Sequence, residues 1–335
     1  MKIREIENKS DWEGFLLGQN PNTFLHSWNY GVMQELLGEK VVRYGCFDGD
    51  RLIGVVLGVT VTARRGKFLF CPHGPIVVNN DSKIIELLIL ALKNFAHENG
   101  SAFLRISPLE LQINTNIELY KKLGMRPAPM HMHAETMWVL DIKPSEEVLM
   151  QGMRKTTRNL VRRAERDGVK IRISRDINDL DLFEQVYKET ADREKFVGFS
   201  KKYLEAEFSA LNKDNHVFLA FAEYQGDIIS TALITVYGNT GFYHQGASTR
   251  KHAKVPGAYL LQWEIIRELK RLGIQRYNFW GISDDPKHPW AGLSLFKQGF
   301  GGYREDYLHA QDLPLKPSYW LTYIIEQIRR KKRGY

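Results

Sequence analysis

Three short segments recur along the chain at nearly one spacing, and this repeat restricts the folds that the sequence can adopt. Each segment has the same expected context in both halves, at a turn, a strand end or a helix end. They are 47–50 (FDGD) and 224–227 (YQGD), 177 residues apart, 105–107 (RIS) and 281–283 (GIS), 176 apart, and 122–125 (KLGM) and 297–300 (KQGF), 175 apart. Because the three offsets nearly agree, the sequence predicts a tandem duplication of one structural unit.

The first copy is expected to contain a hairpin, a long helix, a strand and a short helix. We expect strands at 43–47, 52–63, 67–72 and 102–106, a helix at 83–97 and a short helix that ends before Gly124. Ahead of these, the sequence predicts a first strand, a helix from Asp11, a strand at 23–26 and a helix at 28–37. This order of elements favours a mixed α/β fold of the N-acetyltransferase (GNAT) type.

The second copy contains the stretch 243–302, where we expect the chemistry. A strand ends near Ala247, apolar residues at helical spacing predict a helix that stops at Gly273, and aromatic residues predict a strand at 277–280. A last short helix is expected at 293–298. A strand, a basic loop, a helix and a second strand form a βαβ unit whose loops can hold a ligand.

Length and composition allow two domains. The chain has 335 residues, 43% of them apolar, which suffices for two cores. We expect one domain at 1–143 together with 313–335, to which a helix at 319–328 returns, and a second at 144–312. The two cysteines, Cys46 and Cys71, lack metal or redox spacing, and no apolar run is long enough for a signal peptide or membrane span. The sequence therefore predicts a cytoplasmic protein.

The formal net charge of +8 is concentrated in two clusters. Arg158, Arg162 and Arg166 are four residues apart, so they share one face of a helix expected at 154–167. The second cluster is the wholly basic segment 329–333. Both clusters are compatible with a solvated surface and with an anionic partner.

The loop before the long helix of the second copy argues against coenzyme A. GNAT enzymes that use acyl-CoA hold its pyrophosphate with a glycine-rich loop at a helix N-terminus. The corresponding loop, 250–258, is basic but lacks that glycine spacing, and Pro256 removes one amide donor. The fold favours acyl transfer, whereas this loop disfavours CoA as the donor.

The chain resembles the FemABX family, bacterial transferases that build peptidoglycan interpeptide bridges from aminoacyl-tRNA. The resemblance covers essentially the whole chain and is most specific in YLLQW (259–263) and LFKQGFGG (295–302). It extends to FLHSWNYG (24–31), HGP (73–75) and MRKTTRNLVRRAERDGVKI (153–171). Longer members insert a helical-hairpin arm in the second domain. No long charged heptad stretch is present here, so the chain resembles the compact, arm-free members.

The resemblance implies that an amino acid moves from aminoacyl-tRNA to the stem-peptide amine of a peptidoglycan precursor, either lipid II or UDP-MurNAc-pentapeptide. In the family a Phe-Lys pair of the short helix stabilises the oxyanion of this reaction, and it matches Phe296 and Lys297. Substrate-binding positions are expected at Tyr203 and Tyr243, and at three sites that depart from the family: Gln34 replaces a lysine, Ser107 a carboxylate and Gln245 a tyrosine.

The same resemblance gives the basic residues a partner, because phosphate contacts from Arg and Lys dominate tRNA binding. The residues expected to bind tRNA are Arg158, Arg162, Arg163, Arg166, Arg250, Lys251 and Lys254. The basic C-terminal segment predicts weak contact with an anionic membrane at its cytoplasmic face. We expect no cofactor beyond the tRNA co-substrate and no metal. The alternatives are an acyl-CoA-dependent N-acyltransferase and a non-catalytic tRNA-binding module.

Overall fold

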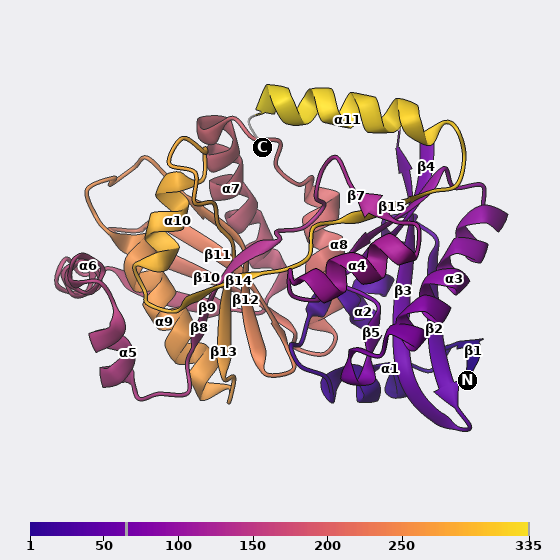
Figure 1. Cartoon of the computed structure of the whole chain (residues 1–335). Coiled ribbons are helices and arrows are strands. Elements are labelled where there is room, and N and C mark those ends of the chain that lie inside the picture. Colours follow the sequence, from indigo (N-terminus) through magenta and orange to yellow (C-terminus); the bar gives the residue numbers. More distant parts are fainter. Residues whose placement is uncertain (64–65, 334–335) are drawn as a thin grey trace. The chain divides into compact units, whose positions relative to one another are not determined.

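The computed structural model describes residues 1–63 and 66–333, and its internal contacts divide the chain into two units (Figure 1). One unit comprises residues 1–135 and 306–335, and the other comprises residues 136–305. Each unit is built on one mixed sheet with helices packed on both of its faces.

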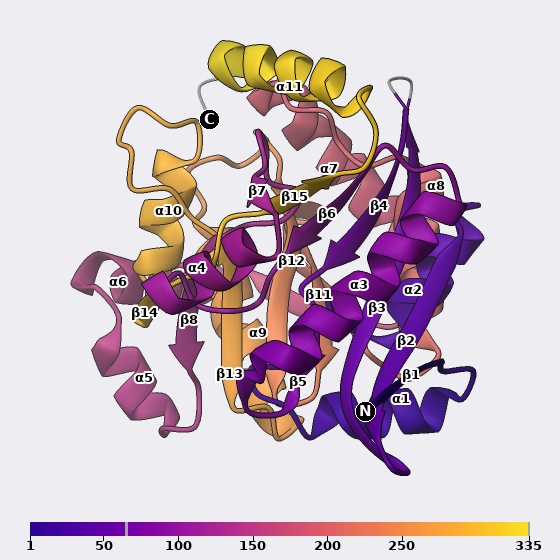
Figure 2. The same cartoon turned by 45° about the vertical axis from the view of Figure 1, so that its right-hand side comes forward.

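The sheet of the first unit has the strand order β1-β2-β3-β4-β6-β15-β7, with β5 paired to β3. Its strands are β1 (Lys2–Glu5), β2 (Val41–Asp48), β3 (Arg51–Ala63), β4 (Gly66–Pro72), β5 (Ile76–Val77), β6 (Phe103–Ser107), β7 (Arg126–Pro127) and β15 (Gln311–Pro314). Its helices are α1 (Lys9–Leu17), η1 (Phe24–His26), α2 (Trp28–Leu36), η2 (Val78–Asn80), α3 (Ser82–Glu98), α4 (Asn114–Lys122) and α11 (Tyr319–Arg333). Figure 2 shows α3 lying across β2 and β3.

The sheet of the second unit has the order β14-β8-β13-β12-β11-β10-β9. Its strands are β8 (Thr136–Asp141), β9 (Lys170–Ser174), β10 (Val217–Tyr224), β11 (Asp227–Tyr237), β12 (Thr240–Ser248), β13 (Arg276–Gly281) and β14 (Tyr303–Asp306). Its helices are α5 (Glu146–Gly152), α6 (Lys155–Arg166), η3 (Ile177–Asp179), α7 (Leu180–Glu194), α8 (Lys201–Asn212), α9 (Gly257–Arg271) and α10 (Ala291–Gln298). One face carries α6 and α9, and the other carries α7 and α8.

The predicted duplication and the mixed α/β fold are confirmed. In each unit an antiparallel run of strands leads to one parallel pair, β4–β6 in the first and β12–β13 in the second. A further antiparallel strand follows, β15 in the first unit and β8 in the second. The long helices α3 and α9 and the short helices α4 and α10 occupy equivalent places in chain order. The longest helices of the second unit have 15 residues, so its described part contains no long hairpin arm.

Two local features differ from the sequence-based expectation. Residues 23–26, expected as a strand, contain the 3-10 turn η1, because Thr23 Oγ1 accepts from the Leu25 amide and the Trp12 indole donates to the His26 carbonyl. The boundaries between the two units, at 135/136 and 305/306, also lie earlier in the chain than the expected limits of 143 and 312. Pairing explains this shift, since β8 joins β13 of the second sheet and β15 joins β6 of the first.

Candidate active site

The two units differ at their central parallel strands. In the first unit, β4 and β6 pair from Leu69 and Leu104 to Pro72 and Ser107, the last residues of both strands. In the second unit, β12 and β13 pair only over Thr240–Phe242. Beyond that point β12 continues along β11 and β13 continues along β8. The second sheet therefore opens between β12 and β13, whereas the first remains paired.

A bulge lies in each strand at this opening. On β12, Tyr243 faces Ile234 and Gln245 faces Leu233, so His244 is the extra residue. On β13 the register shifts between Asn278 and Gly281, and Trp280 has a φ of 69°. The Asn278 side chain stabilises this bulge, because its Oδ1 accepts from the Trp280 amide at 2.8 Å.

Lys297 of α10 reaches this opening. Its side chain is buried, and its Nζ donates to the Gly281 carbonyl at 2.6 Å and lies 6.0 Å from the ring centre of Tyr243. Among the described residues no carboxylate forms an ion pair with it. Burial lowers the pKa of Lys297 from 10.5 to about 7. A buried amine held only by a carbonyl is typical of a functional group rather than of a structural lysine.

Aromatic rings surround the lysine. The Phe296 ring, half-buried, lies 5.0 Å from the Tyr259 ring of α9 and 5.4 Å from the Phe300 ring. Tyr243 is on the same sheet face, and burial raises its pKa to about 12. Position 246 of the same strand, β12, must have no side chain, since a Cβ at Gly246 would overlap the Tyr243 hydroxyl. The structure thus brings together Phe296, Lys297 and Tyr243, which the sequence analysis had singled out.

The two remaining residues of this unit that are expected to bind substrate, Tyr203 and Gln245, lie on the opposite sheet face, where α8 packs. Tyr203 is on α8, where its ring stacks on Phe199 at 4.2 Å, and Gln245 is buried on β12. Between them lies a pair that the sequence analysis missed: His244 Nδ1 is 2.5 Å from Glu207 Oε1, and both side chains are almost fully buried. Two features of the sequence could have indicated this pair. Glu207 follows Tyr203 by one helical turn, and His244 lies between Tyr243 and Gln245, which were both expected to bind substrate.

The basic helix α6 joins the candidate site to the loop 249–256. Its side chains Thr157, Val161 and Ala164 are buried in the core, which leaves Arg162, Arg163 and Arg166 exposed. Arg163 donates to the Lys254 carbonyl at 3.1 Å. Arg158 is half-buried and donates to the carbonyls that end α5, those of Met150 and Gln151. The N-terminus of α6 contacts the end of α10, because the Arg154 amide donates to the Gly299 carbonyl.

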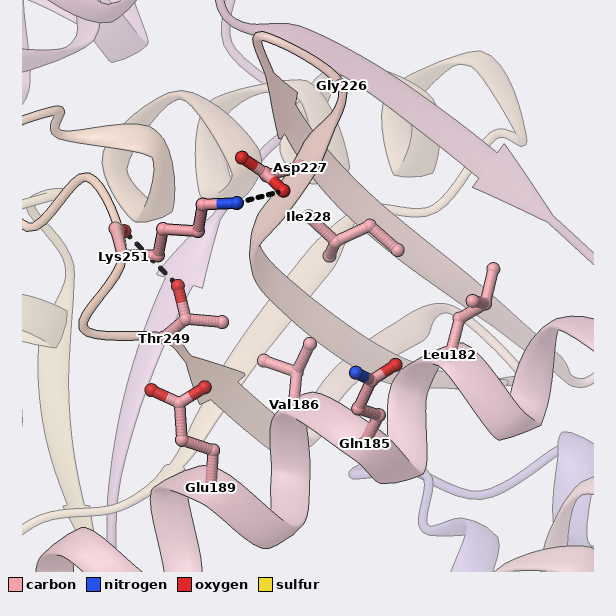
Figure 3. Close-up of a pocket in the computed structure, with 9 residues that line it drawn as sticks. All are labelled: Leu182, Gln185, Val186, Glu189, Gly226, Asp227, Ile228, Thr249 and Lys251. Atoms are coloured by element: carbon pink, nitrogen blue, oxygen red, sulfur yellow. Dashed lines mark hydrogen bonds and ion pairs between the residues drawn. The ribbon is translucent and has the colours of Figure 1, made fainter.

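Two cavities adjoin this loop. One of about 530 Å³ is lined by residues 248–259 together with Leu160, Arg193, Ile229 and Ser230, at the N-terminus of α9. The other, of about 390 Å³, lies between α7 and the start of β11 (Figure 3). In Figure 3 Lys251 reaches Asp227, with Nζ 2.6 Å from Oδ1. Arg250, Lys251 and Lys254 are all exposed, and of the three Lys251 is the one whose side chain pairs with a carboxylate, that of Asp227.

The other two expected substrate residues belong to the first unit. Gln34 is half-buried near the end of α2, and Ser107 is buried at the end of β6, where its Oγ has no hydrogen-bond partner among the described residues. Ser107 stands where the family resemblance places a carboxylate, and a carboxylate, that of Glu110, is buried three residues further on. Its Oε1 accepts from the Tyr120 hydroxyl at 3.1 Å, and burial raises its pKa from 4.5 to about 7.

The described residues offer neither a metal cluster nor a membrane span. They contain no group of three or more His, Cys, Asp or Glu side chains arranged to hold a metal ion. The ring of His133, which alternates with His131 along the chain, packs against the rings of Phe70 and His73. No helix in 1–63 or 66–333 has the length and apolar character needed to cross a membrane.

Fold and site together define a tandem GNAT-type protein whose second unit alone has an opened central strand pair, with a buried lysine at the opening. The chain belongs to the FemAB family, because the model of that family matches residues 8–228 and 204–327.

Known proteins similar to this chain include a curated relative and two solved structures. The aminoacyltransferase FemB of Staphylococcus epidermidis is 22% identical over 422 aligned positions, which cover 99% of each chain. The crystal structure of FemX superimposes with a TM-score of 0.85 at 17% identity, covering 98% of this chain and 100% of that one. A tandem GNAT protein from the clavulanic acid biosynthesis pathway has a TM-score of 0.61 at 12% identity, covering 94% and 99%.

Proposed function

We propose that this protein is an aminoacyltransferase that moves an amino acid from aminoacyl-tRNA to the stem-peptide amine of a peptidoglycan precursor. The observation that carries the proposal is the buried amine of Lys297 at the only opened parallel strand pair of the described chain. Membership of the FemAB family and the similarity to a protein named aminoacyltransferase FemB support the transfer of an aminoacyl group. The duplicated GNAT-type fold supports acyl transfer to an amine.

The reaction needs a cation where negative charge develops. When an amine attacks the ester carbon of an aminoacyl-tRNA, the carbonyl oxygen becomes an oxyanion, and the ribose hydroxyl then leaves. In its protonated form Lys297 can donate to that oxygen while Gly281 holds the ammonium in position. A pKa near 7 means that the amine is readily deprotonated in the free protein, and an adjacent oxyanion favours its charged form.

The donor is proposed to lie along α6 and the loop 249–256. Arg162, Arg166, Arg250 and Lys254 are exposed and can reach phosphates, and the contact between α6 and the end of α10 links them to Lys297. Phe296 is half-buried next to Lys297, so its ring can stack on the terminal adenosine. Arg158 and Lys251 are already engaged with carbonyls and a carboxylate, and we assign them a smaller share of tRNA binding.

The acceptor is proposed to be lipid-linked and to be used at the cytoplasmic face of the membrane. Helix α11 exposes Trp320, Leu321, Ile324 and Ile328, and Arg329 and Arg330 follow. Exposed apolar residues next to basic ones favour the surface of an anionic bilayer. The substitution of glutamine for lysine at position 34 disfavours a diphosphate grip on a UDP-linked acceptor.

The test is a transfer assay with a mixture of aminoacylated tRNAs and either lipid II or UDP-MurNAc-pentapeptide. Mass spectrometry of the acceptor should show the addition of one amino acid, with lipid II preferred. The same assay with acetyl-CoA should show no acetylation. Acetylation without aminoacyl transfer would replace the proposal by a CoA-dependent N-acyltransferase. Binding of tRNA without any product would indicate a non-catalytic tRNA-binding module.

A further inference from the structure

The strongest unassigned feature of the second unit is the buried pair His244–Glu207. Glu207 projects from α8, its side chain is 1% exposed, and its Oε1 is 2.5 Å from Nδ1 of His244. No other ion pair to Glu207 exists among the described residues. Burying a carboxylate costs several kcal/mol unless a proton donor or a cation compensates it. The partner here is a histidine, the side chain best suited to accept and release a proton near neutral pH.

The close ion-pair contact with Glu207 sets which imidazole nitrogen faces the carboxylate. Because Nδ1 faces Glu207, a proton exchanged with a substrate would travel through Nε2. A carboxylate in this position holds the ring in one orientation and stabilises the imidazolium that forms when Nε2 accepts a proton. The Trp280 ring packs edge-on against the imidazole, with ring centres 5.4 Å apart, and restricts it further.

His244 and Lys297 approach the opening of the sheet from opposite faces. Tyr243, which faces Lys297, opposes Ile234 on the face covered by α9. His244, the bulge residue, is turned to α8 on the other face. Residues 280 and 281 of β13 connect the two groups, since the Trp280 ring contacts His244 and the Gly281 carbonyl accepts from Lys297.

We propose that His244, held by Glu207, is the base that deprotonates the acceptor amine, and that the acceptor approaches from the α8 face while the donor ester lies on the Lys297 face. This assignment rests on the proposed function. The acceptor arrives as an ammonium and loses one proton through Nε2 to solvent. The amine then attacks the ester carbon and forms the new C–N bond. The proton lost by that nitrogen passes through Nε2 to the ribose oxygen as the C–O bond breaks.

The position of Tyr203 supports an acceptor on this face. Tyr203 precedes Glu207 by four residues, so both side chains lie on the same side of α8. It is the residue that the family resemblance marks for substrate contact. A substrate bound against Tyr203 would extend along α8 toward the Glu207–His244 pair.

The test uses the full-length His244→Ala protein in the transfer assay. Loss of a general base typically lowers the rate by about 10²–10⁴, and we expect such a fall in kcat with KM for both substrates changed less than about threefold. Imidazole added to the buffer should restore kcat at least about tenfold, because it can occupy the space left by the ring. Glu207→Gln should also lower kcat, but imidazole should not restore it, since the histidine is still present.

Matched variants separate chemistry from structure. His216→Ala removes a histidine that packs on Tyr237 elsewhere in the same unit, and it should leave kcat unchanged and insensitive to imidazole. If His244→Ala does not fold, His244→Gln replaces it. Full activity of a folded His244 variant, or a loss in His244→Ala that imidazole does not restore, would overturn the assignment. In His244→Gln the side chain fills the site of the ring, so the expected result is a fall in kcat with little change in KM and without rescue by imidazole. A wild-type protein that transfers nothing from aminoacyl-tRNA would overturn the proposed function, and the role of His244 with it.

Discussion

At the scale of single residues, Lys297 combines a cost in stability with the proposed function. Its amine has a pKa of 10.5 when exposed and about 7 in the folded protein. A lowered lysine pKa means that the unfolded chain binds the proton more tightly, so the free energy of unfolding falls as the pH decreases from 10.5 to 7. Below pH 7 the cost is complete and amounts to roughly 5 kcal/mol.

Lys297→Met should therefore give a protein that is less active and more stable. Removing one donor to an oxyanion costs about 10²–10³ in rate, so kcat should fall at least tenfold, while the unfolding midpoint at pH 6 should rise. Urea unfolding at pH 6 and pH 9 measures the stability, and the gain should be smaller at pH 9. Lys122→Met, at the equivalent position of the first copy and exposed, is the control that should change neither quantity. Near-normal transfer by Lys297→Met would exclude this lysine from the mechanism.

Glu110 gives the opposite dependence on pH. Its pKa rises from 4.5 to about 7 on folding, so the free energy of unfolding is highest below pH 4.5 and falls as the pH increases to 7. Glu110→Gln should remove this loss, worth about 3 kcal/mol, and should keep the hydrogen bond from Tyr120. Urea unfolding at pH 5 and pH 8 should show a larger pH effect in the wild type than in the variant. The exposed Glu118→Gln on α4 should behave like the wild type; equal pH effects in all three proteins would contradict the assignment.

At the scale of elements, the regular strands and helices could be predicted from the sequence, whereas the bulges could not. Helix α3 was expected at 83–97 and spans Ser82–Glu98, because its apolar residues recur at helical spacing and Asp81 caps it. The bulge at His244 leaves no mark in the hydrophobic pattern, since it depends on how β12 pairs with β11. The sequence therefore identified Tyr243 and Gln245 but not that their side chains point to opposite faces. Glu207 was missed because its burial is set by tertiary packing.

Helix α6 allows a prediction about tRNA. Replacing Arg162 and Arg166 with Gln should weaken tRNA binding. The slope of the logarithm of the binding constant against the logarithm of the salt concentration should become shallower by about 0.7–0.9 for each phosphate that is no longer neutralised. Arg158 is left in place because it holds the end of α5. Filter binding at several salt concentrations measures the slope. Lys83→Gln with Lys93→Gln on α3 removes the same charge from an exposed face of the first unit. If the slope is unchanged in the α6 variant, or if it changes equally in the α6 and α3 variants, the arginines of α6 form an ordinary solvated surface.

At the scale of the whole molecule, the two copies keep one architecture, but only the second has an opened central strand pair. In the first copy β4 and β6 are paired to their ends. There Arg105 pairs with Asp312 at 2.7 Å and with Glu326 of α11 at 2.8 Å. The repeat in the sequence revealed the duplication, because landmarks such as FDGD and YQGD mark turns. It did not reveal that β8 joins the second sheet through β13 and that β15 joins the first sheet through β6. Both pairings are between segments that are distant in sequence.

The same scale gives the prediction on membranes. Trp320 is 46% exposed, Leu321 63%, Ile324 56% and Ile328 49%, and the basic segment 329–333 follows. Each basic residue near an anionic bilayer contributes about 1 kcal/mol, and the apolar side chains add to this by burial in the interface. The protein should therefore float with anionic vesicles at low salt and leave them at high salt, because screening removes the electrostatic share.

Two pairs of substitutions decide whether α11 is the part of the protein that binds the membrane. Leu321→Glu with Ile324→Glu should abolish flotation and lower transfer to lipid II in vesicles, while transfer to UDP-MurNAc-pentapeptide stays unchanged, since that acceptor needs no membrane. Leu17→Glu with Leu36→Glu alters two side chains of the same unit that are 50% and 52% exposed on α1 and α2, and it should leave flotation intact. If the α11 variant still floats, the exposed face of α11 has no part in membrane binding. If the wild type ignores vesicles and prefers the UDP-linked acceptor, the protein acts on a water-soluble precursor.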